Sequence, residues 1–146
     1  MGKKPKLKNL PVEKKESKIS PKNSPDSFMS LNPSWKFCWL AFDGQWGWSK
    51  IEEVKTWERI VKQLQNWESM KWIEILNNPR NHQIHRDQLD KNVQKWLDRR
   101  NLDDFETYSL HVGGKERIFG ILIQGVFYVI WWDPDHKICP APKKHT

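Results

Sequence analysis

The chain reads FETYSLHVGGKERIFGILIQGVFYVIWWDP from Phe105 to Pro134. Three runs rich in β-branched and aromatic residues are separated here by Gly113-Gly114 and by Gln124-Gly125, and the last run ends at Asp133-Pro134. Glycine-containing pairs at this spacing are typical of β-hairpin turns. The pattern therefore predicts an antiparallel meander with strands at residues 105–112, 116–123 and 126–132.

The third run, residues 126–132, is apolar almost throughout. Such a run is expected of a strand that is covered on both faces, so we place it at the centre of its sheet. At least one face of the sheet must then be packed by helices.

Two amphipathic helices are predicted upstream of the meander. The first follows Ser49-x-x-Glu52, which has the form of a capping box, and its apolar residues recur every three or four positions. These residues are Ile51, Val54, Trp57, Val61, Leu64 and Trp67. The second spans about residues 87–100, with Leu89, Val93, Trp96 and Leu97 on its apolar face. Between them we expect a helical turn at 72–76 and a polar loop at 77–85.

Residues 35–43 alternate large apolar side chains and end at Asp43-Gly44, which predicts a first strand and a turn. The fold class is therefore α+β: an N-terminal strand, two helices, and then a three-stranded antiparallel meander packed on the helices. Trp46 and Trp48 flank Gly47 after this strand. We interpret this pair as a lid on a small core, with a base-stacking platform as the second interpretation.

Charge divides the chain, whose formal net charge is +7. Residues 1–33 hold eight lysines against three carboxylates and few apolar side chains, so we predict a disordered lysine-rich tail. A solubilising tail is favoured over an electrostatic arm for a polyanion. Residues 34–146 hold 17 basic and 15 acidic side chains and are expected to form a single domain with a short basic C-terminal tail.

The sequence also argues against several functional classes. It contains no apolar run of the roughly 20 residues that cross a bilayer and no secretory apolar stretch, so we expect a cytoplasmic protein without membrane contact. Cys38 and Cys139 match no zinc or redox spacing. There is no phosphate-binding glycine loop and no G-x-S-x-G motif. Because His82-x-x-His85 has no evident third ligand, no metal and no cofactor is expected.

Two charged clusters flank the last hairpin: Lys115-Glu116-Arg117 begins one strand, and Asp133-Pro-Asp-His136-Lys137 follows the next. In an antiparallel meander these positions lie at one edge, so Arg117, His136 and Lys137 are expected to be neighbours. Arginine binds phosphate, histidine transfers protons near neutral pH and lysine offsets negative charge. This set suits metal-free RNA cleavage by the 2′-hydroxyl.

The sequence by itself favours a different interpretation of the same residues. Arg117 would be a surface brace that pairs with Glu116, Asp133 or Asp135, and Asp133-Pro134 would be only a turn. Exposed ion pairs of this kind are common, and each contributes little to stability.

The order of elements and residues 110–137 resemble the RelE/ParE toxin superfamily, which includes HigB-like ribosome-dependent mRNA interferases. The family's arginine-bearing strand resembles GGKERIFGIL at residues 113–122, and its apolar strand resembles VFYVIWW at residues 126–132. Its terminal basic segment resembles His136-Lys137. By topology the resemblance covers about residues 35–137, and it implies a RelE-like α+β domain. The long loop at 77–85, the lysine-rich tail and the lack of an aromatic residue after His136 depart from the family pattern.

The resemblance also implies a site. Arg117 matches the strand arginine that contacts the RNA backbone, and His136 and Lys137 fall where members place catalytic basic residues. Further RNA contacts are implied for His111, Lys115, Lys143, Lys144 and His145.

We therefore expect the toxin of a toxin–antitoxin system, a ribosome-dependent mRNA endonuclease that inhibits translation without a metal. Its partners would be mRNA on the ribosome and a cognate antitoxin. The alternative is a non-catalytic module that presents Trp46, Trp48 and Trp132 to RNA or to a protein. A third interpretation, an interaction protein without a nucleic-acid role, is supported by the nearly neutral body.

Overall fold

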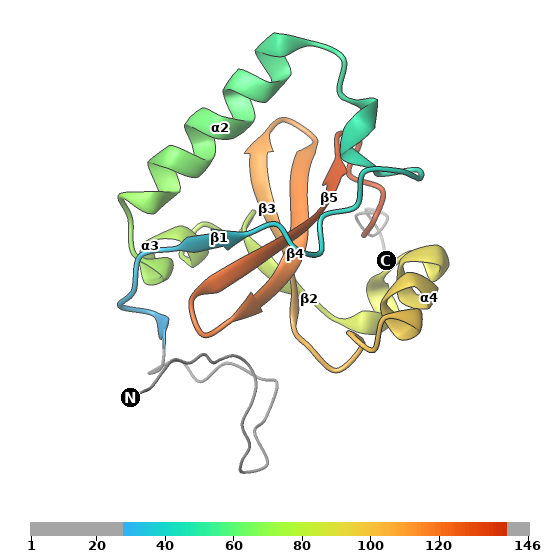
Figure 1. Ribbon diagram of the computed structural model, residues 1–146. Coiled ribbons are helices and arrows are strands. Elements are labelled where there is room, and N and C mark those ends of the chain that lie inside the picture. The colour runs from blue at the N-terminus through green and yellow to red at the C-terminus, as the bar shows by residue number, and fades with distance from the viewer. Residues whose placement is uncertain (1–27, 140–146) are drawn as a thin grey trace, which may run out of the picture.

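The predicted meander forms the middle of a five-stranded sheet (Figure 1). The computed structural model describes residues 28–139. Its meander strands are β3 (Thr107–Gly113), β4 (Glu116–Ile123) and β5 (Val126–Asp133), paired antiparallel. Gln124 and Gly125 both have positive φ, as a type I′ hairpin turn requires.

The strand order and the two edge strands of the sheet differ from the sequence prediction. The strand order is β1-β5-β4-β3-β2, so the middle strand is β4 and not the apolar β5. The first strand, β1, covers only Ser34–Lys36, because the chain leaves the sheet in turns after Lys36. It runs parallel to β5. The predicted polar loop contains β2 (His82–Ile84), which pairs with β3.

Three α-helices occur within residues 28–139: α2 (Val54–Glu68), α3 (Trp72–Leu76) and α4 (Lys91–Arg99). The capping box predicted at Ser49 is wrong. Ser49 lies in a 3-10 turn, Trp48–Lys50, where its hydroxyl donates to the Phe42 carbonyl at 2.6 Å, and Glu53 is the N-cap of α2. At α4 the Asp90 carboxylate accepts a hydrogen bond from the Asn92 N–H at 2.8 Å and caps the helix.

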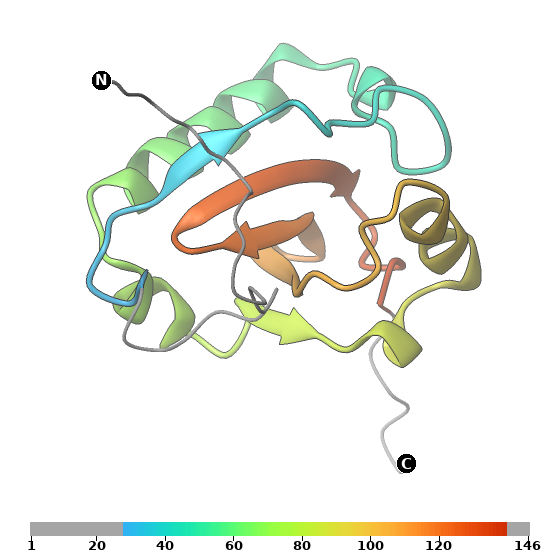
Figure 2. The same ribbon diagram turned by 60° about the horizontal axis from the view of Figure 1, so that its bottom comes forward.

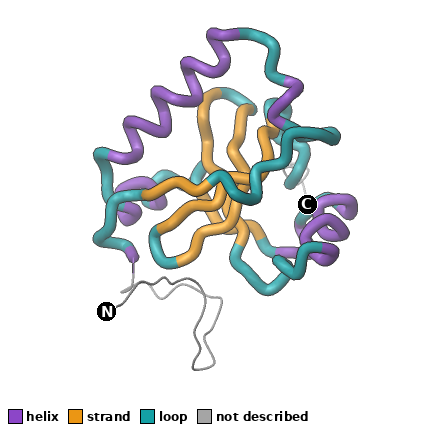
Figure 3. The backbone as a smooth tube through the Cα atoms, viewed as in Figure 1, coloured by secondary structure: helices purple, strands orange, loops and turns teal. Residues whose placement is uncertain are grey.

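The helices cover opposite faces of the sheet, as Figures 2 and 3 show for α2 and α4. Helices α2 and α3 share one apolar core with one set of sheet side chains, including Leu110, Ile118 and Trp132. Helix α4 shares the second core with the alternate set, including Phe119 and Trp131. The sheet is thus buried on both sides, as the apolar third run indicated.

Helix α2 contacts the sheet through a narrower face than the sequence predicted. Ile60 and Trp67 are buried, whereas Val54, Trp57 and Val61 are exposed. The regular spacing identified the helix correctly, but the neighbouring elements cover only one side of its apolar stripe.

The first six described residues fall within the predicted tail, and they pack against the body. Phe28 is buried, and the Asn32 side-chain amide donates to the carbonyls of Glu68 and Met70 at 3.1 and 2.9 Å. None of the helices found between residues 28 and 139 is long and apolar enough to cross a membrane.

Gly120 in β4 is predicted to be irreplaceable. A Cβ there would lie 2.2 Å from the Tyr128 carbonyl oxygen and 2.7 Å from the Phe127 ring, next to a register shift between β4 and β5. Gly120→Ala should lower the free energy of unfolding by about 3 kcal/mol or more through overpacking. Urea denaturation measures this loss.

Gly113→Ala is the matched control, because its added Cβ meets only a Glu116 side-chain oxygen at 3.7 Å. We expect a change of less than about 1 kcal/mol for this variant. Equal losses in the two variants would contradict the close approach at Gly120.

Candidate functional site

Three charged or polar side chains form a row across the meander. His111 on β3 is paired with Arg117 on β4, and Arg117 is paired with Asp133 on β5. Directly paired residues of neighbouring strands point to the same face of a sheet. Arg117 lies two residues before Phe119 on β4, and Asp133 lies two residues after Trp131 on β5. Since Phe119 and Trp131 pack in the core with α4, the row lies on the α4 face of the sheet.

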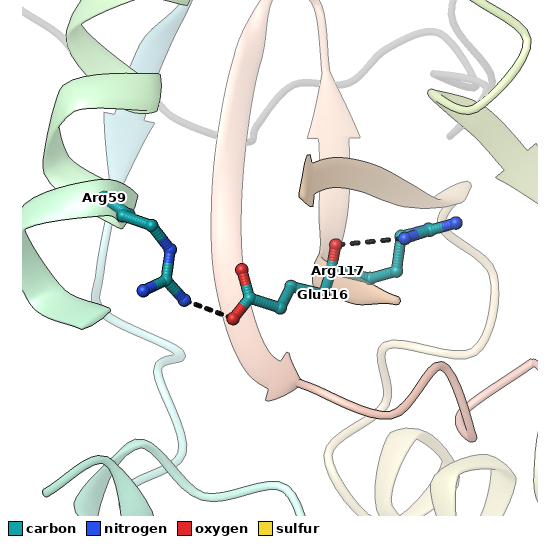
Figure 4. Close-up of polar contacts among 3 residues, drawn as sticks. All are labelled: Arg59, Glu116 and Arg117. Carbon is teal, nitrogen blue, oxygen red and sulfur yellow. Dashed lines mark hydrogen bonds and ion pairs between the residues drawn. The ribbon is translucent and has the colours of Figure 1, made fainter. Parts of the chain in front are cut away.

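Arg117 is nearly enclosed, with 8% of its surface exposed. Its Nη1 donates to the carbonyls of Gly114 and Glu116 at 2.8 and 3.1 Å, whereas its buried Nε has no hydrogen-bond partner within residues 28–139. Figure 4 shows Arg117 and Glu116 projecting in opposite directions from β4. A buried donor without a partner is costly, and none of the residues 28–139 supplies an acceptor for Nε of Arg117.

The surface-brace interpretation of Arg117 is not supported. Glu116 points to α2, where it forms an ion pair with Arg59 (Figure 4). Arg117 forms no ion pair with any carboxylate of residues 28–139. Asp133 is its cross-strand neighbour, but the carboxylate oxygens of Asp133 accept hydrogen bonds from the backbone N–H groups of Lys137 and Ile138, both at 2.9 Å.

The Gly114 carbonyl links Arg117 to His111. Besides accepting from Arg117, this oxygen lies 3.2 Å from Nε2 of His111. A carbonyl can only accept, so Nε2 is the protonated nitrogen in this contact, and the Nδ1 of a neutral His111 carries a lone pair. One backbone oxygen thus positions a cation and a potential general base together.

His136 joins this cluster through the turn that follows β5. Its φ of 59° is in the left-handed region, which is unfavourable for most side chains and least so for asparagine and aspartate. The two hydrogen bonds accepted by Asp133 close this turn and hold it in place. Arg117 is paired with Asp133, three residues before His136, and the charge of Arg117 contributes to the lowered pKa of His136.

Burial and neighbouring positive charge favour the neutral form of both imidazoles. Burial and then the charge of Arg117 lower the pKa of His111, with a further contribution from Arg80. Burial and then Arg117 likewise lower the pKa of His136, whereas Asp133 opposes the shift. Burial and then Arg80 lower the pKa of Arg117 itself, whereas Asp133 again opposes the shift. Asp133, with Glu116 at His111, therefore offsets part of the positive charge, and the remainder is suited to an anion.

Strand β2 and the turn before it bring two further residues, His82 and Arg80, to the cluster, and the sequence prediction did not include either. The charge of Arg80 is felt by His111 and Arg117, and that of His82 by His136. The buried Asn81 anchors the segment, since its side chain accepts from the His111 N–H at 2.7 Å and donates to the Ile75 carbonyl at 2.9 Å. The run Arg80-Asn-His82 in a polar stretch was the available signal.

The remaining predicted site residues have different positions. Lys115 is exposed in the β3–β4 turn, and Lys137 is exposed beside His136. Lys143, Lys144 and His145 lie outside the described residues. Trp46, Trp48 and Trp132 are at most 7% exposed and belong to the two cores, so they form no open stacking platform.

His85 is separate from this cluster. It precedes the 3-10 turn Arg86–Gln88 and forms a capping box with Gln88. Within residues 28–139, no three His, Cys, Asp or Glu side chains are grouped in a way that could hold a metal ion.

Asp133 is predicted to stabilise the turn that carries His136. In Asp133→Asn the new amide nitrogen cannot accept a hydrogen bond, so one of the two N–H groups loses its partner. We expect a loss of about 2 kcal/mol in the free energy of unfolding, measured by urea denaturation. Asp135→Asn, which changes the exposed neighbour, should be nearly neutral. Similar losses for both variants would contradict this role.

Arg117→Met is predicted to raise the pKa of both His111 and His136, because it removes a nearby positive charge and keeps an apolar stem. Nitrogen-detected NMR titration of the imidazoles measures this change. In the folded intact chain the pKa values of His111 and His136 lie below the ordinary histidine value, so the unfolded chain binds more protons in mild acid. Stability should therefore fall as the pH drops below about 6.5. Unchanged imidazole pKa values in Arg117→Met would contradict the described electrostatics.

Comparisons with models of protein families, with curated proteins and with solved structures find no match to this chain. The resemblance to the RelE/ParE superfamily consequently remains a prediction from the sequence pattern.

Proposed function

We propose that the cluster of Arg117, His111 and His136 binds an RNA phosphodiester and cleaves it without a metal ion. The observation that carries this proposal is the nearly enclosed Arg117, whose guanidinium shares the Gly114 carbonyl with His111 and is not ion-paired with any carboxylate of residues 28–139. A phosphate that contacts the guanidinium would accept a charge-assisted hydrogen bond and offset the local positive charge.

In the proposed reaction, the RNA 2′-hydroxyl oxygen attacks the adjacent phosphorus and the bond from phosphorus to the 5′-oxygen breaks. One imidazole removes the 2′-hydroxyl proton, and a protonated imidazole donates a proton to the leaving 5′-oxygen. The products are a 2′,3′-cyclic phosphate and a 5′-hydroxyl end. The bound phosphate supplies a negative charge that raises the pKa of a nearby histidine, which allows one imidazole to be protonated.

His111 is the candidate base through Nδ1, and His136 is the candidate acid. Arg117 stabilises the negative charge that develops on the phosphate oxygens. Lys137, which follows His136 and is exposed, adds positive charge near the phosphate. His82 and Arg80 complete the positive surroundings from the β2 side.

The sequence resemblance supplies the biological part of the proposal. A RelE/HigB-like toxin would act on mRNA in the ribosome, inhibit translation and be held by an antitoxin, all in the cytoplasm. The alternative is a non-catalytic module in which the same cluster binds RNA phosphate without cleaving it. The enclosed Arg117 guanidinium is consistent with both.

Induced expression in a bacterial host, with growth and mRNA integrity as readouts, tests the proposal. The intact chain should arrest growth and cut mRNA, leaving cyclic phosphate ends. Arg117→Met and His136→Asn should each reduce cleavage by about 100-fold or more. Asparagine is chosen at His136 because it tolerates the left-handed backbone better than most residues.

Two exposed residues outside the cluster provide matched controls. Arg86→Met removes an arginine that pairs with Asp98, and His85→Asn keeps a side chain that can cap the 3-10 turn. Both variants should remain as active as the intact chain. Intact mRNA with a folded, abundant protein would refute the nuclease and leave phosphate binding, and full activity in Arg117→Met would remove this cluster from the mechanism.

A further inference from the structure

Helix α4 presents a row of positive charge outside the cluster described above. Lys91, Lys95 and Arg99 are four residues apart, so they lie on one side of the helix at intervals of about 6 Å. All three are exposed, and none forms an ion pair with a carboxylate of residues 28–139. Like charges at this spacing repel each other, so the row favours a negatively charged partner.

An open depression of about 290 Å³ adjoins this row. Trp46 and Trp131, both nearly buried, contribute to its lining together with the half-buried Trp96. The exposed Asp43, Asn92, Lys95 and Arg99 also line it, and they provide hydrogen-bond donors and acceptors. Aromatic walls with polar groups nearby are the features that bind a planar, hydrogen-bonding ring such as a nucleobase.

The three indoles are held in a fixed arrangement. Trp131 meets Trp96 at 4.5 Å and Trp46 at 6.4 Å between ring centroids, edge to face in both cases. The Arg100 guanidinium carbon lies 3.9 Å from the Trp96 ring centroid, which fixes that ring from another side. The aromatic surface therefore exists before any ligand binds, and little ordering cost remains for binding.

This surface is continuous with the Arg117 cluster. The Asp90 N–H at the start of α4 donates to the Ile138 carbonyl at 2.8 Å, which brings Lys91 near the segment that carries His136 and Lys137. Figures 1 and 2 both show the chain after β5 running next to the entry to α4. In addition, Trp131 lies on the same sheet face as Asp133, two residues before it.

We infer that α4 and this depression form a second RNA subsite, which binds the phosphates and one base of single-stranded RNA that extends from the cleavage site. The inference takes RNA as the ligand from the proposed function. Lys91, Lys95 and Arg99 contact successive phosphates, and a base contacts the half-buried Trp96 in the depression, with the nearly buried Trp46 and Trp131 packed beneath it. Contacts of this type bind single strands with little sequence preference from the phosphates.

Binding of a fluorescein-labelled 12-nucleotide RNA with a 2′-deoxy backbone at its centre, measured by anisotropy over a range of salt concentrations, tests the inference. The central deoxynucleotides prevent 2′-hydroxyl cleavage there, so binding is observed without turnover. Lys95→Gln/Arg99→Gln should weaken binding at least about tenfold and reduce the salt slope by about 1.4. Trp96→Leu should weaken binding about tenfold by removing aromatic contact.

Helix α2 provides controls of the same chemical type within the full chain. Lys55→Gln/Lys62→Gln removes two exposed lysines, and Trp57→Leu removes an exposed indole that stacks on Trp48. Binding should decrease much less in these variants than in the α4 variants. Circular dichroism and thermal unfolding establish that each variant is folded, and if Trp96→Leu fails to fold, the charge variant still decides the result.

The outcomes separate this inference from the proposed function. If the α4 variants bind RNA like the intact chain while Arg117→Met abolishes cleavage, the subsite is refuted and the nuclease stands. If the α4 variants lose binding although the intact chain cleaves no RNA, the subsite stands and the nuclease is refuted. Equal losses for the α2 and α4 variants would indicate nonspecific charge attraction and overturn the inference.

Discussion

Burial of β4 on both faces is the constraint on which the rest of the structure depends. Alternate side chains of this strand must enter different cores, so Ile118 packs with α2 and α3 whereas Phe119 packs with α4. The same alternation separates Glu116, which pairs with Arg59, from Arg117. It also requires Gly120, where the Phe127 ring and the Tyr128 carbonyl leave no space for a side chain. Arg117 is thereby directed to the α4 face and enclosed there.

The enclosure of Arg117 gives the candidate site its character. A guanidinium that is largely removed from water needs hydrogen-bond acceptors. Nη1 donates to two backbone carbonyls, whereas Nε donates to no acceptor of the described residues. The nearest carboxylate in the strand register, Asp133, already binds the backbone of the following turn. Its oxygens therefore stabilise the turn that carries His136, while its charge offsets part of that of Arg117 without forming an ion pair.

The positions of the charged side chains are more informative than the net charge. Residues 34–146 are nearly neutral overall, yet Arg80, Arg117 and the neighbouring histidines gather at one end of the sheet. A second set, Lys91, Lys95 and Arg99, lies along α4. The hydrogen bond between Asp90 and Ile138 joins these regions through the backbone. Near-neutral composition therefore does not argue against a polyanionic ligand, because electrostatic attraction depends on local charge.

The sequence by itself determined the meander and the pairing of the strand that carries Arg117 with the strand that precedes His136, because hairpin turns and strand alternation are local properties. It did not reveal β2, whose three residues become a strand only by pairing with β3, or the shortness of β1. Only the tertiary structure decided that α2 and α4 cover opposite faces, that Ser49 bonds Phe42 instead of capping α2, and that Trp46, Trp48 and Trp132 are buried. Periodicity tells which residues share a face, but the element that meets this face is set by packing between distant segments.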